Sequence, residues 1–381
     1  MSTTRWDRLF HAYGTAGDTP GHLAALRGTD PAAVKAALTH LDGAILHQDT
    51  VWTATPPVVA EVIDLITAPQ GHPELAALVR WLGWAMDAVR DLEVGPEPIP
   101  VPDEAELEAF LTATAEENEA AWGMPVLDLL MRQAVVDVRA LAPRIAAAVV
   151  PLLDHADGEV RREALSALGS AAGLVPAAER HPLQQHLAAL VSASDHRDEK
   201  AARLLALGAA GGNTSEWLTD PDPAVRACAA LGDAGPAATA VLLDVLRDPA
   251  GCDAWFERRP PQLHTHVRFA LLSNLLSREV ALAELVPAAT AMIALAGGFD
   301  LDRVVGPILQ RTFPEVRFTP GVRPAPAENW TEAQCAIVAA LVANDRIWDP
   351  TDGNANLARM RVGLPEGRDA VAALLAQHRR R

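Results

Sequence analysis

Apolar residues recur along this chain with the spacing of an α-helix. Four segments carry apolar side chains three or four residues apart over two turns or more, at 34–41, 59–66, 75–89 and 127–141. Side chains at this spacing lie on one side of a helix, so each segment predicts an amphipathic helix with one buried side. We find no clear run of alternating apolar and polar residues, and we therefore expect no β-strands.

Helix-start signals and composition agree with this pattern. A capping side chain stands directly before proline at three places: Asp30-Pro31, Thr55-Pro56 and Asp222-Pro223. The capping oxygen accepts a free backbone N–H, and proline at the first helical position loses no hydrogen bond. Thr331 and Gln334 have the spacing of a capping box. Ala and Leu, both strong helix formers, supply most of the apolar residues, whereas only 4% of the chain is aromatic. The expected fold class is all-α.

One short motif occurs more than once, which indicates structural repeats. The segments DHADGEVRREALSALG (154–169) and DPDPAVRACAALG (220–232) both place an aspartate before Val-Arg and end in Leu-Gly. A third Val-Arg pair stands at 267–268. Helix pairs of this kind cannot bury their apolar sides alone, so we expect stacked neighbours to share one elongated core.

The second of these segments resembles the second half of a HEAT repeat, through Asp220, Asp222, Pro223, Val225, Arg226, Ala229 and Leu231. The N-terminal sequence, from LFHAYGTAG onward, also resembles the opening of HEAT-like proteins of high-GC bacteria. The resemblance implies a right-handed α-solenoid of stacked antiparallel helix pairs, a HEAT-like or armadillo-type superhelix. It also implies a binding scaffold, since HEAT arrays usually bind other molecules and few are enzymes.

Two irregular stretches divide the predicted repeats. Prolines at 96, 98, 100 and 102 prevent a helix between residues 93 and 104. A second irregular segment follows at 312–329. The expected organisation is N-terminal HEAT-like repeats over 1–92, a Pro-rich acidic loop over 93–104, central repeats over 105–311, an irregular linker over 312–329 and a C-terminal helical cap over 330–381.

A polar tetrapeptide, HQDT at 47–50, separates two predicted helices. One interpretation is a ligand site, with His11 and His40 nearby. The other is a structural turn in which Gln48 and Thr50 hydrogen-bond to the helix ends, while the following tryptophan fills the gap between the helices. The sequence favours the turn, because a buried polar turn must be hydrogen-bonded whatever its function.

Charge is concentrated in one part of the chain. The net charge of −17 opposes a nucleic-acid partner, which needs a field of Lys and Arg. Residues 91–131 hold eleven acidic side chains and no basic one, with Trp81 and Trp84 before the segment and Trp122 within it. Carboxylates beside aromatic rings suit a partner with a basic surface, and the alternative is a solvated helix face. The candidate binding residues are Trp81, Trp84, Glu104, Glu108 and Trp122, together with His47 and Trp52 of the polar turn.

Arginines recur at matching positions of the repeats, at Arg161, Arg226 and Arg268. The HEAT resemblance implies that such an arginine pairs with an aspartate of a neighbouring repeat, and the candidate aspartates are Asp157 and Asp222. The alternative is an anion-binding row of arginines. The structural ladder is the favoured interpretation.

Sequence signals for catalysis, cofactors and metals are missing. The twelve histidines form no HExxH motif, no His-Glu pair and no Cys/His cluster, so we expect no metal. His264 and His266 stand two residues apart, which points them to different sides of a helix. Neither GxSxG nor a phosphate-binding loop is present, and no catalytic residue or cofactor is predicted.

Cysteine usage and the ends of the chain bear on its compartment. The three cysteines contain no CxxC pair and fit a reducing compartment. The N-terminus has no apolar signal-peptide core, and no apolar run is long enough for a membrane span. A cytoplasmic protein is expected.

The leading functional hypothesis is a non-enzymatic protein-interaction scaffold that uses the concave face of the solenoid. One version is an immunity or antitoxin protein that binds a basic toxin. The alternative is an enzyme on a HEAT-like scaffold, either a biosynthetic small-molecule enzyme or an alkylpurine DNA glycosylase-like protein. Its ligand would lie in a pocket lined by tryptophan and carboxylates, such as Glu104 and Glu108, one helical turn apart. A structural subunit of a larger assembly is a third hypothesis.

Overall fold

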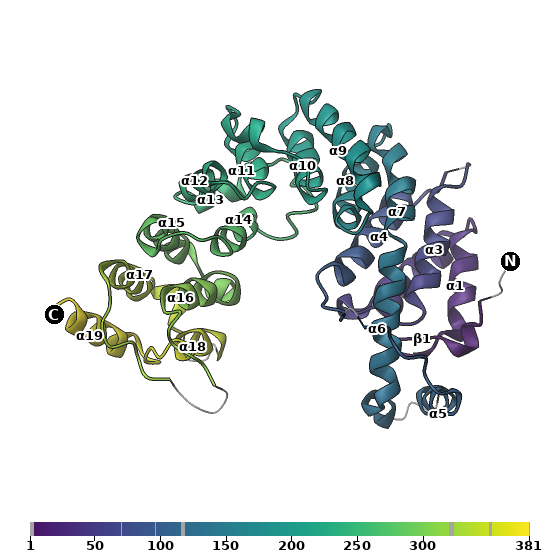
Figure 1. Ribbon diagram of the computed structural model, residues 1–381, viewed down its shortest axis with the longest axis horizontal. Coiled ribbons are helices and arrows are strands. Elements are labelled where there is room, and N and C mark those ends of the chain that lie inside the picture. The colour runs from purple at the N-terminus through teal and green to yellow at the C-terminus, as the bar shows by residue number, and fades with distance from the viewer. Residues whose placement is uncertain are drawn as a thin grey trace. The chain divides into compact units, whose positions relative to one another are not determined.

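The computed structural model of this chain describes residues 4–69, 71–95, 97–115, 119–319, 324–349 and 353–380. The described part is mostly helical, and its helices pack mainly against helices that neighbour them in sequence (Figure 1). The predicted all-α class is thereby confirmed. None of the described helices combines the length and the apolarity that crossing a bilayer requires.

The chain forms two compact units. Unit 1 comprises Met1–Ala193 and Leu205–Gly212, and unit 2 comprises Ser194–Leu204 and Asn213–Arg381. Helix α10 (Arg197–Ala209) is divided between the two units. The five-part division expected from the sequence was drawn from predicted repeats and not from compact units. It stays a prediction.

Unit 1 is built from a run of helices joined by short turns. Its α-helices are α1 (Thr19–Leu26), α2 (Pro31–His40), α3 (Thr55–Ile66), α4 (Leu75–Arg90), α5 (Glu104–Ala115), α6 (Pro125–Ala140), α7 (Ala142–Val149), α8 (Gly158–Ala172) and α9 (Ala177–Ser192). Its shorter 3-10 and π turns are η1 (Trp6–Arg8), η2 (Ala16–Asp18), η3 (Leu41–Ile45), η4 (His47–Asp49), η5 (Glu119–Gly123) and η6 (Val150–Asp154). The four apolar stripes of the sequence fall on α2, α3, α4 and α6, as predicted.

Helix α4 is the centre of unit 1, where it packs against α3, α6 and α8. Gly83 allows α8 to approach closely, because a Cβ atom at this position would lie only 3.2 Å from the Cα atom of Ala167. The α4 side chains Leu78, Leu82 and Met86 are fully buried. The apolar residues of the 75–89 segment therefore belong to the core of this unit.

The expectation of no β-strands is wrong for the N-terminus. Strands β1 (Phe10–His11) and β2 (Gly14–Thr15) form an antiparallel hairpin in which Phe10 pairs with Thr15 and His11 with Gly14. Two residues per strand are too few to show an alternating pattern in sequence. The hairpin also depends on Gly14, whose φ of 123° is rarely accessible to residues with a side chain.

Unit 2 follows the same building principle. Its elements are η7 (Ser215–Thr219), α11 (Pro223–Leu231), α12 (Pro236–Val245), α13 (Pro249–Asp253), α14 (Val267–Leu276), α15 (Leu282–Leu295), η8 (Gly298–Asp300), η9 (Leu301–Val305), α16 (Gly306–Thr312), α17 (Glu332–Ala343), η10 (Asp345–Ile347), α18 (Gly353–Met360) and α19 (Arg368–His378). Helix α11 packs on α12, and α15 packs on α17.

The predicted helix caps are confirmed in three places. The carboxylate of Asp30 accepts the N–H of Ala32, and that of Asp222 accepts the N–H of Ala224. Thr331 forms the capping box predicted for α17. Thr55 is different, because it lies inside the first turn of α3 rather than before it.

Candidate functional site

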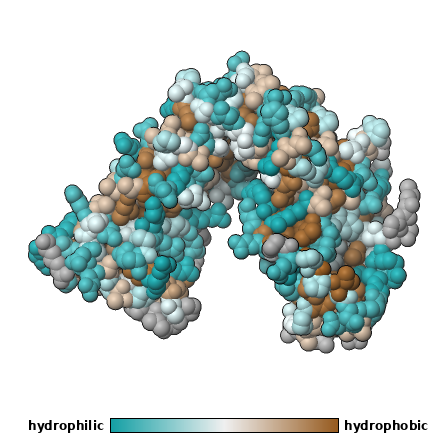
Figure 2. Space-filling model, viewed as in Figure 1, coloured by the Kyte–Doolittle hydropathy of each residue, from teal (hydrophilic) through white to brown (hydrophobic). Residues whose placement is uncertain are grey.

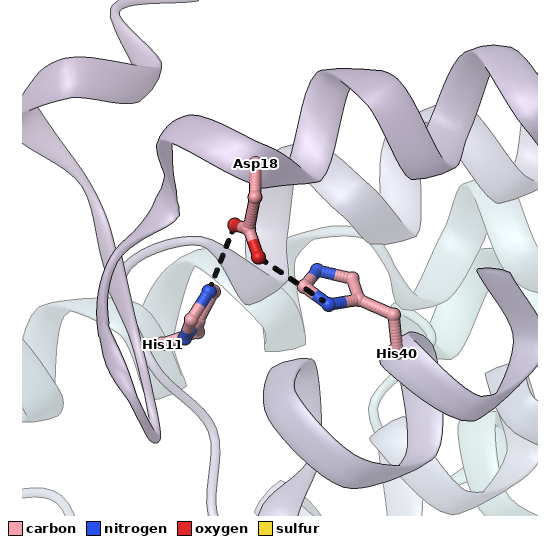
Figure 3. Close-up of side chains that lie close together, drawn as sticks. All are labelled: His11, Asp18 and His40. Atoms are coloured by element: carbon pink, nitrogen blue, oxygen red, sulfur yellow. Dashed lines mark hydrogen bonds and ion pairs between the residues drawn. The ribbon is translucent and has the colours of Figure 1, made fainter. Parts of the chain in front are cut away.

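Three side chains from different elements of unit 1 converge beside the N-terminal hairpin. His11 lies on β1, Asp18 directly precedes α1, and His40 ends α2. Atom Nε2 of His11 lies 3.0 Å from one carboxylate oxygen of Asp18, and Nδ1 of His40 lies 3.9 Å from the other (Figure 3). The imidazole side chains are only 5% and 7% exposed, whereas that of Asp18 is 55% exposed. The cluster therefore opens to solvent on the side of Asp18.

Neighbouring groups hold both imidazole rings in place. The backbone N–H of Tyr13 donates to Nδ1 of His11 at 3.1 Å, so the neutral ring carries its proton on Nε2 and donates it to Asp18. Atom Nε2 of His40 lies 3.1 Å from the hydroxyl oxygen of the buried Thr19. The ring of His22 stacks on that of His40, with centroids 4.1 Å apart. These contacts fix the orientation of the rings.

Burial and charge set the protonation of this cluster. Burial, assisted by His22, lowers the pKa of His40 to about 4, although Asp18 acts to raise it. Burial also acts to raise the pKa of Asp18, but the hydrogen bond from His11 and the neighbouring imidazoles outweigh it and leave that pKa below its usual value. At neutral pH an ionised carboxylate therefore faces an uncharged His40.

The low pKa of His40 predicts that acid destabilises the folded chain. In the unfolded chain this ring binds a proton near pH 6.5, whereas in the folded chain it does so only near pH 4. The folded state therefore loses stability as the pH falls from 6.5 to 4. We expect a contribution of about 1–2 kcal/mol after allowing for solvent screening. Chemical denaturation of the wild type and His40→Gln at pH 7 and pH 4.5 measures it. The variant should lose less stability on acidification, and equal losses would contradict the assignment.

The polar tetrapeptide at 47–50 forms a turn, but the predicted roles of Gln48 and Thr50 at the helix ends are wrong. The turn is tight, with φ angles of 51° at Gln48 and 58° at Asp49, and the Thr50 hydroxyl donates within it to the Gln48 carbonyl. The Thr55 hydroxyl joins the helix ends instead: it donates to the Ile45 carbonyl and accepts the N–H of residue 52.

His47 and the histidine cluster are neighbours, as the ligand-site interpretation requires. Atom Nδ1 of His47 lies 3.0 Å from the carbonyl oxygen of Gly43 and 3.3 Å from the hydroxyl of Tyr13. The ring of Tyr13 also contacts that of His11 edge-on. Tyr13 is 66% exposed and contacts both histidines, so it links His47 to His11.

The four candidate tryptophans have different environments. Trp81 is fully buried, whereas Trp84 is 40% exposed and Trp122 is 45% exposed. Trp52 is half-buried and contacts the rings of Trp122 and Phe10 edge-on. Trp81 therefore belongs to the core and is removed from the binding candidates, while Trp84 and Trp122 remain accessible.

Glu104 and Glu108 lie one turn apart on α5 and share one cation. The two guanidinium nitrogens of Arg8 each lie 2.7 Å from a carboxylate oxygen, one of Glu104 and one of Glu108. Arg8 precedes Glu104 by 96 positions and Glu108 by 100, so a count of charges within the acidic segment missed it. The two carboxylates are not a free acid/base pair, which opposes the pocket-type enzyme hypothesis.

The aspartates and arginines of the recurring sequence motif make local contacts that support the helices they belong to. Arg161 donates to the carbonyls five and six residues before it, and Arg226 does the same. Asp157 caps α8, and Asp222 pairs with Arg197 while it caps α11. Arg268 pairs with two aspartates, Asp253 and Asp300.

The prediction that His264 and His266 point to different sides of a helix is wrong. Both residues precede α14 and line one pocket of about 440 Å³ in unit 2. Phe269 and Arg303 also line this pocket, and Nδ1 of His266 lies 3.1 Å from a carboxylate oxygen of Asp253. Because α14 begins only at Val267, the two histidines do not follow helical geometry.

Sequence reasoning missed Asp18 and His22 and did not group His11 with His40 as a site. One signal was present, since four of the twelve histidines fall within the first 47 residues, at 11, 22, 40 and 47. All three cysteines are free and buried. Burial raises the pKa of Cys228 and raises that of Cys252 to about 12, so neither thiol is activated.

No protein-family model matches this chain, and no curated protein matches it either. The helical content and the sequential packing are the part of the HEAT resemblance that the structure shows.

Proposed function

We propose that this chain is a non-enzymatic protein-interaction scaffold, built as a right-handed HEAT-like solenoid, and that unit 1 binds a basic segment of another protein. The binding surface is the partly exposed apolar side of η5 and α6. This surface, called the α6 face below, consists of Trp122, Met124, Leu127, Leu130 and Met131.

Matching hydrogen bonds support the repeat architecture. In α8 and α11 the aspartate accepts the N–H two residues later, and the arginine four residues after it donates to two carbonyls of the preceding loop. The same sequence motif thus builds the same local structure twice. This equivalence is expected of stacked repeats.

The observation that carries the proposal is Trp122, a large aromatic side chain that is held in place yet 45% exposed. Its ring centroid lies 5.8 Å from that of Trp52, which in turn contacts Phe10 of the buried cluster beneath. Tryptophan is enriched among the residues that dominate binding energy, and a fixed ring loses little entropy on binding.

The rest of the α6 face is apolar and adaptable. Met124, Leu127, Leu130 and Met131 pack on the buried cluster but are only partly buried themselves. Figure 2 shows hydrophobic residues gathered on unit 1 around the half of α6 that adjoins β1. Methionine side chains adjust their shape to a partner, and apolar patches of this kind mark interaction sites.

Charge favours a basic occupant. Asp128 is exposed on α6, and Asp103 and Glu106 are exposed at the start of α5. Arg8 neutralises only one of the two negative charges of Glu104 and Glu108, whose side chains remain 73% and 56% exposed. A basic, amphipathic segment can place its apolar side on the α6 face and its lysines among these carboxylates. A basic toxin neutralised by this chain would be such a partner.

A peptide titration tests the proposal. We expect an amphipathic helical peptide of leucine and lysine to bind the full chain, and a peptide with glutamate in place of lysine not to bind. Trp122→Ala should weaken binding by at least about tenfold, the loss expected for a central aromatic anchor. Isothermal titration calorimetry at two salt concentrations measures both effects, because ion pairs weaken at high salt.

The matched control is Phe318→Ala, which removes an exposed aromatic ring of unit 2. This variant should bind the lysine peptide as the wild type does. Equal affinity for both peptides, or an unchanged affinity of Trp122→Ala, would overturn the assignment of the α6 face.

A further inference from the structure

We propose that His11, Asp18 and His40 bind one divalent transition-metal ion of the zinc type. One possible ligand atom from each residue lies within 4.8 Å of the other two. This inference concerns a part of unit 1 other than the α6 face and does not rest on the proposed function.

The spacing of the three ligand atoms suits a small metal ion. Bonds of 2.0–2.1 Å in a tetrahedral site place the ligand atoms about 3.3 Å apart. The contacts from Asp18 to His11 and to His40, at 3.0 and 3.9 Å, lie on either side of this value. The ligand atoms of His11 and His40 lie within 4.8 Å of each other, so side-chain rotations that bring these two rings closer would place all three ligands around one ion.

The surroundings of His40 supply the second layer of contacts that metal-binding histidines usually have. When Nδ1 of His40 binds the ion, the ring proton lies on Nε2, 3.1 Å from the Thr19 hydroxyl that accepts it. The stacked ring of His22 restricts rotation of His40. Thr19 is fully buried, so this contact is shielded from water.

The charge of the cluster also favours a cation. An uncharged imidazole is the form that binds metals, and the side chains of His11 and His40 are only 5% and 7% exposed. Asp18 supplies the negative charge. A metal on Nε2 of His11 displaces the proton now donated to Asp18, and the ring proton moves to Nδ1 at the expense of the Tyr13 N–H contact. This leaves two N–H donors facing each other, at a cost that is less than the binding free energy of a structural zinc ion.

The donor set selects the class of ion. Two imidazole nitrogens and one carboxylate oxygen suit zinc and its first-row neighbours, whereas magnesium and calcium prefer oxygen ligands alone. The side chain of Asp18 is 55% exposed, so the fourth position of the ion faces solvent and is open to water. The three ligands come from β1, the start of α1 and the end of α2, so the ion would link these elements.

Calorimetric titration of the chelator-treated full chain with Zn²⁺ tests the proposal. We expect one ion per chain, a zinc-dependent rise in melting temperature, and no comparable binding of Mg²⁺. Titration with Co²⁺ should give the visible absorption of a four-coordinate site. Asp18→Asn and His40→Asn should each weaken zinc binding by at least about tenfold.

Two control variants separate this site from adventitious binding. His22→Phe keeps the stacked ring without a ligand nitrogen, and the double variant His264→Asn/His266→Asn removes the paired histidines of unit 2. Both should bind zinc as the wild type does, and circular dichroism establishes that every variant is folded. Zinc binding that is absent in the wild type, that survives both ligand substitutions, or that is lost with His264 and His266 would overturn the proposal.

Discussion

Replacing Trp81 with alanine should be among the most damaging single changes in unit 1. The side chain is 1% exposed, it lies on α4 at the centre of the unit, and its Nε1 has no hydrogen-bond partner among the described residues. It therefore contributes by packing, and its removal leaves a large cavity. The expected loss is about 3–5 kcal/mol of unfolding free energy. Urea denaturation followed by circular dichroism measures it.

Trp84→Ala is the matched control for this prediction. Trp84 is the same residue type three positions further along α4, but its side chain is 40% exposed. Less packing is lost there, so we expect a cost of about 1 kcal/mol. Similar losses for the two variants would show that α4 does not bury the side of the helix that the structure assigns to the core.

Arg268→Ala should have a comparable effect on unit 2. The Arg268 side chain is 8% exposed and pairs with Asp253 and Asp300, whose side chains are 17% and 14% exposed. Removing the arginine leaves two poorly solvated carboxylates without this partner. Breaking a buried pair from one side typically costs 3–5 kcal/mol, and we expect about 3 kcal/mol here. Urea denaturation again measures the loss.

Arg226→Ala is the control, because Arg226 follows the same Val-Arg sequence pattern as Arg268. Arg226 donates to the carbonyls of Asp220 and Pro221, which are uncharged acceptors. Its removal should cost about 1 kcal/mol. In the Arg268→Ala background, Asp253→Asn should recover part of the lost stability by removing an unpaired charge. A loss equal to that of Arg226→Ala, with no recovery, would contradict the buried ion-pair assignment.

The helices could be predicted because their signals are local. The apolar stripes at 34–41, 59–66, 75–89 and 127–141 fall on helices, since helical spacing involves side chains only three or four residues apart. The caps at Asp30, Asp222 and Thr331 were readable for the same reason. The hairpin at Phe10 was not, because two-residue strands leave no periodic pattern.

The candidate site was predicted only in part. From the sequence we predict that His11 and His40 lie near the polar turn at 47–50. In the structure the His11 ring contacts the rings of Tyr13 and His40. It did not include Asp18, although that residue lies between the two imidazoles. An isolated aspartate carries no motif, and its role depends on the packing that brings His11 of the hairpin beside His40 of α2.

By itself, the sequence determined the helical class, most of the long helices and the matching helix caps at Asp157 and Asp222, because periodicity and capping act between residues a few positions apart. Only the tertiary structure decided that Trp81 is buried while Trp84 is exposed, and that Arg8 reaches Glu104 and Glu108 across about a hundred residues of chain. These outcomes depend on which helices pack together, and side chains distant in sequence meet only through that packing.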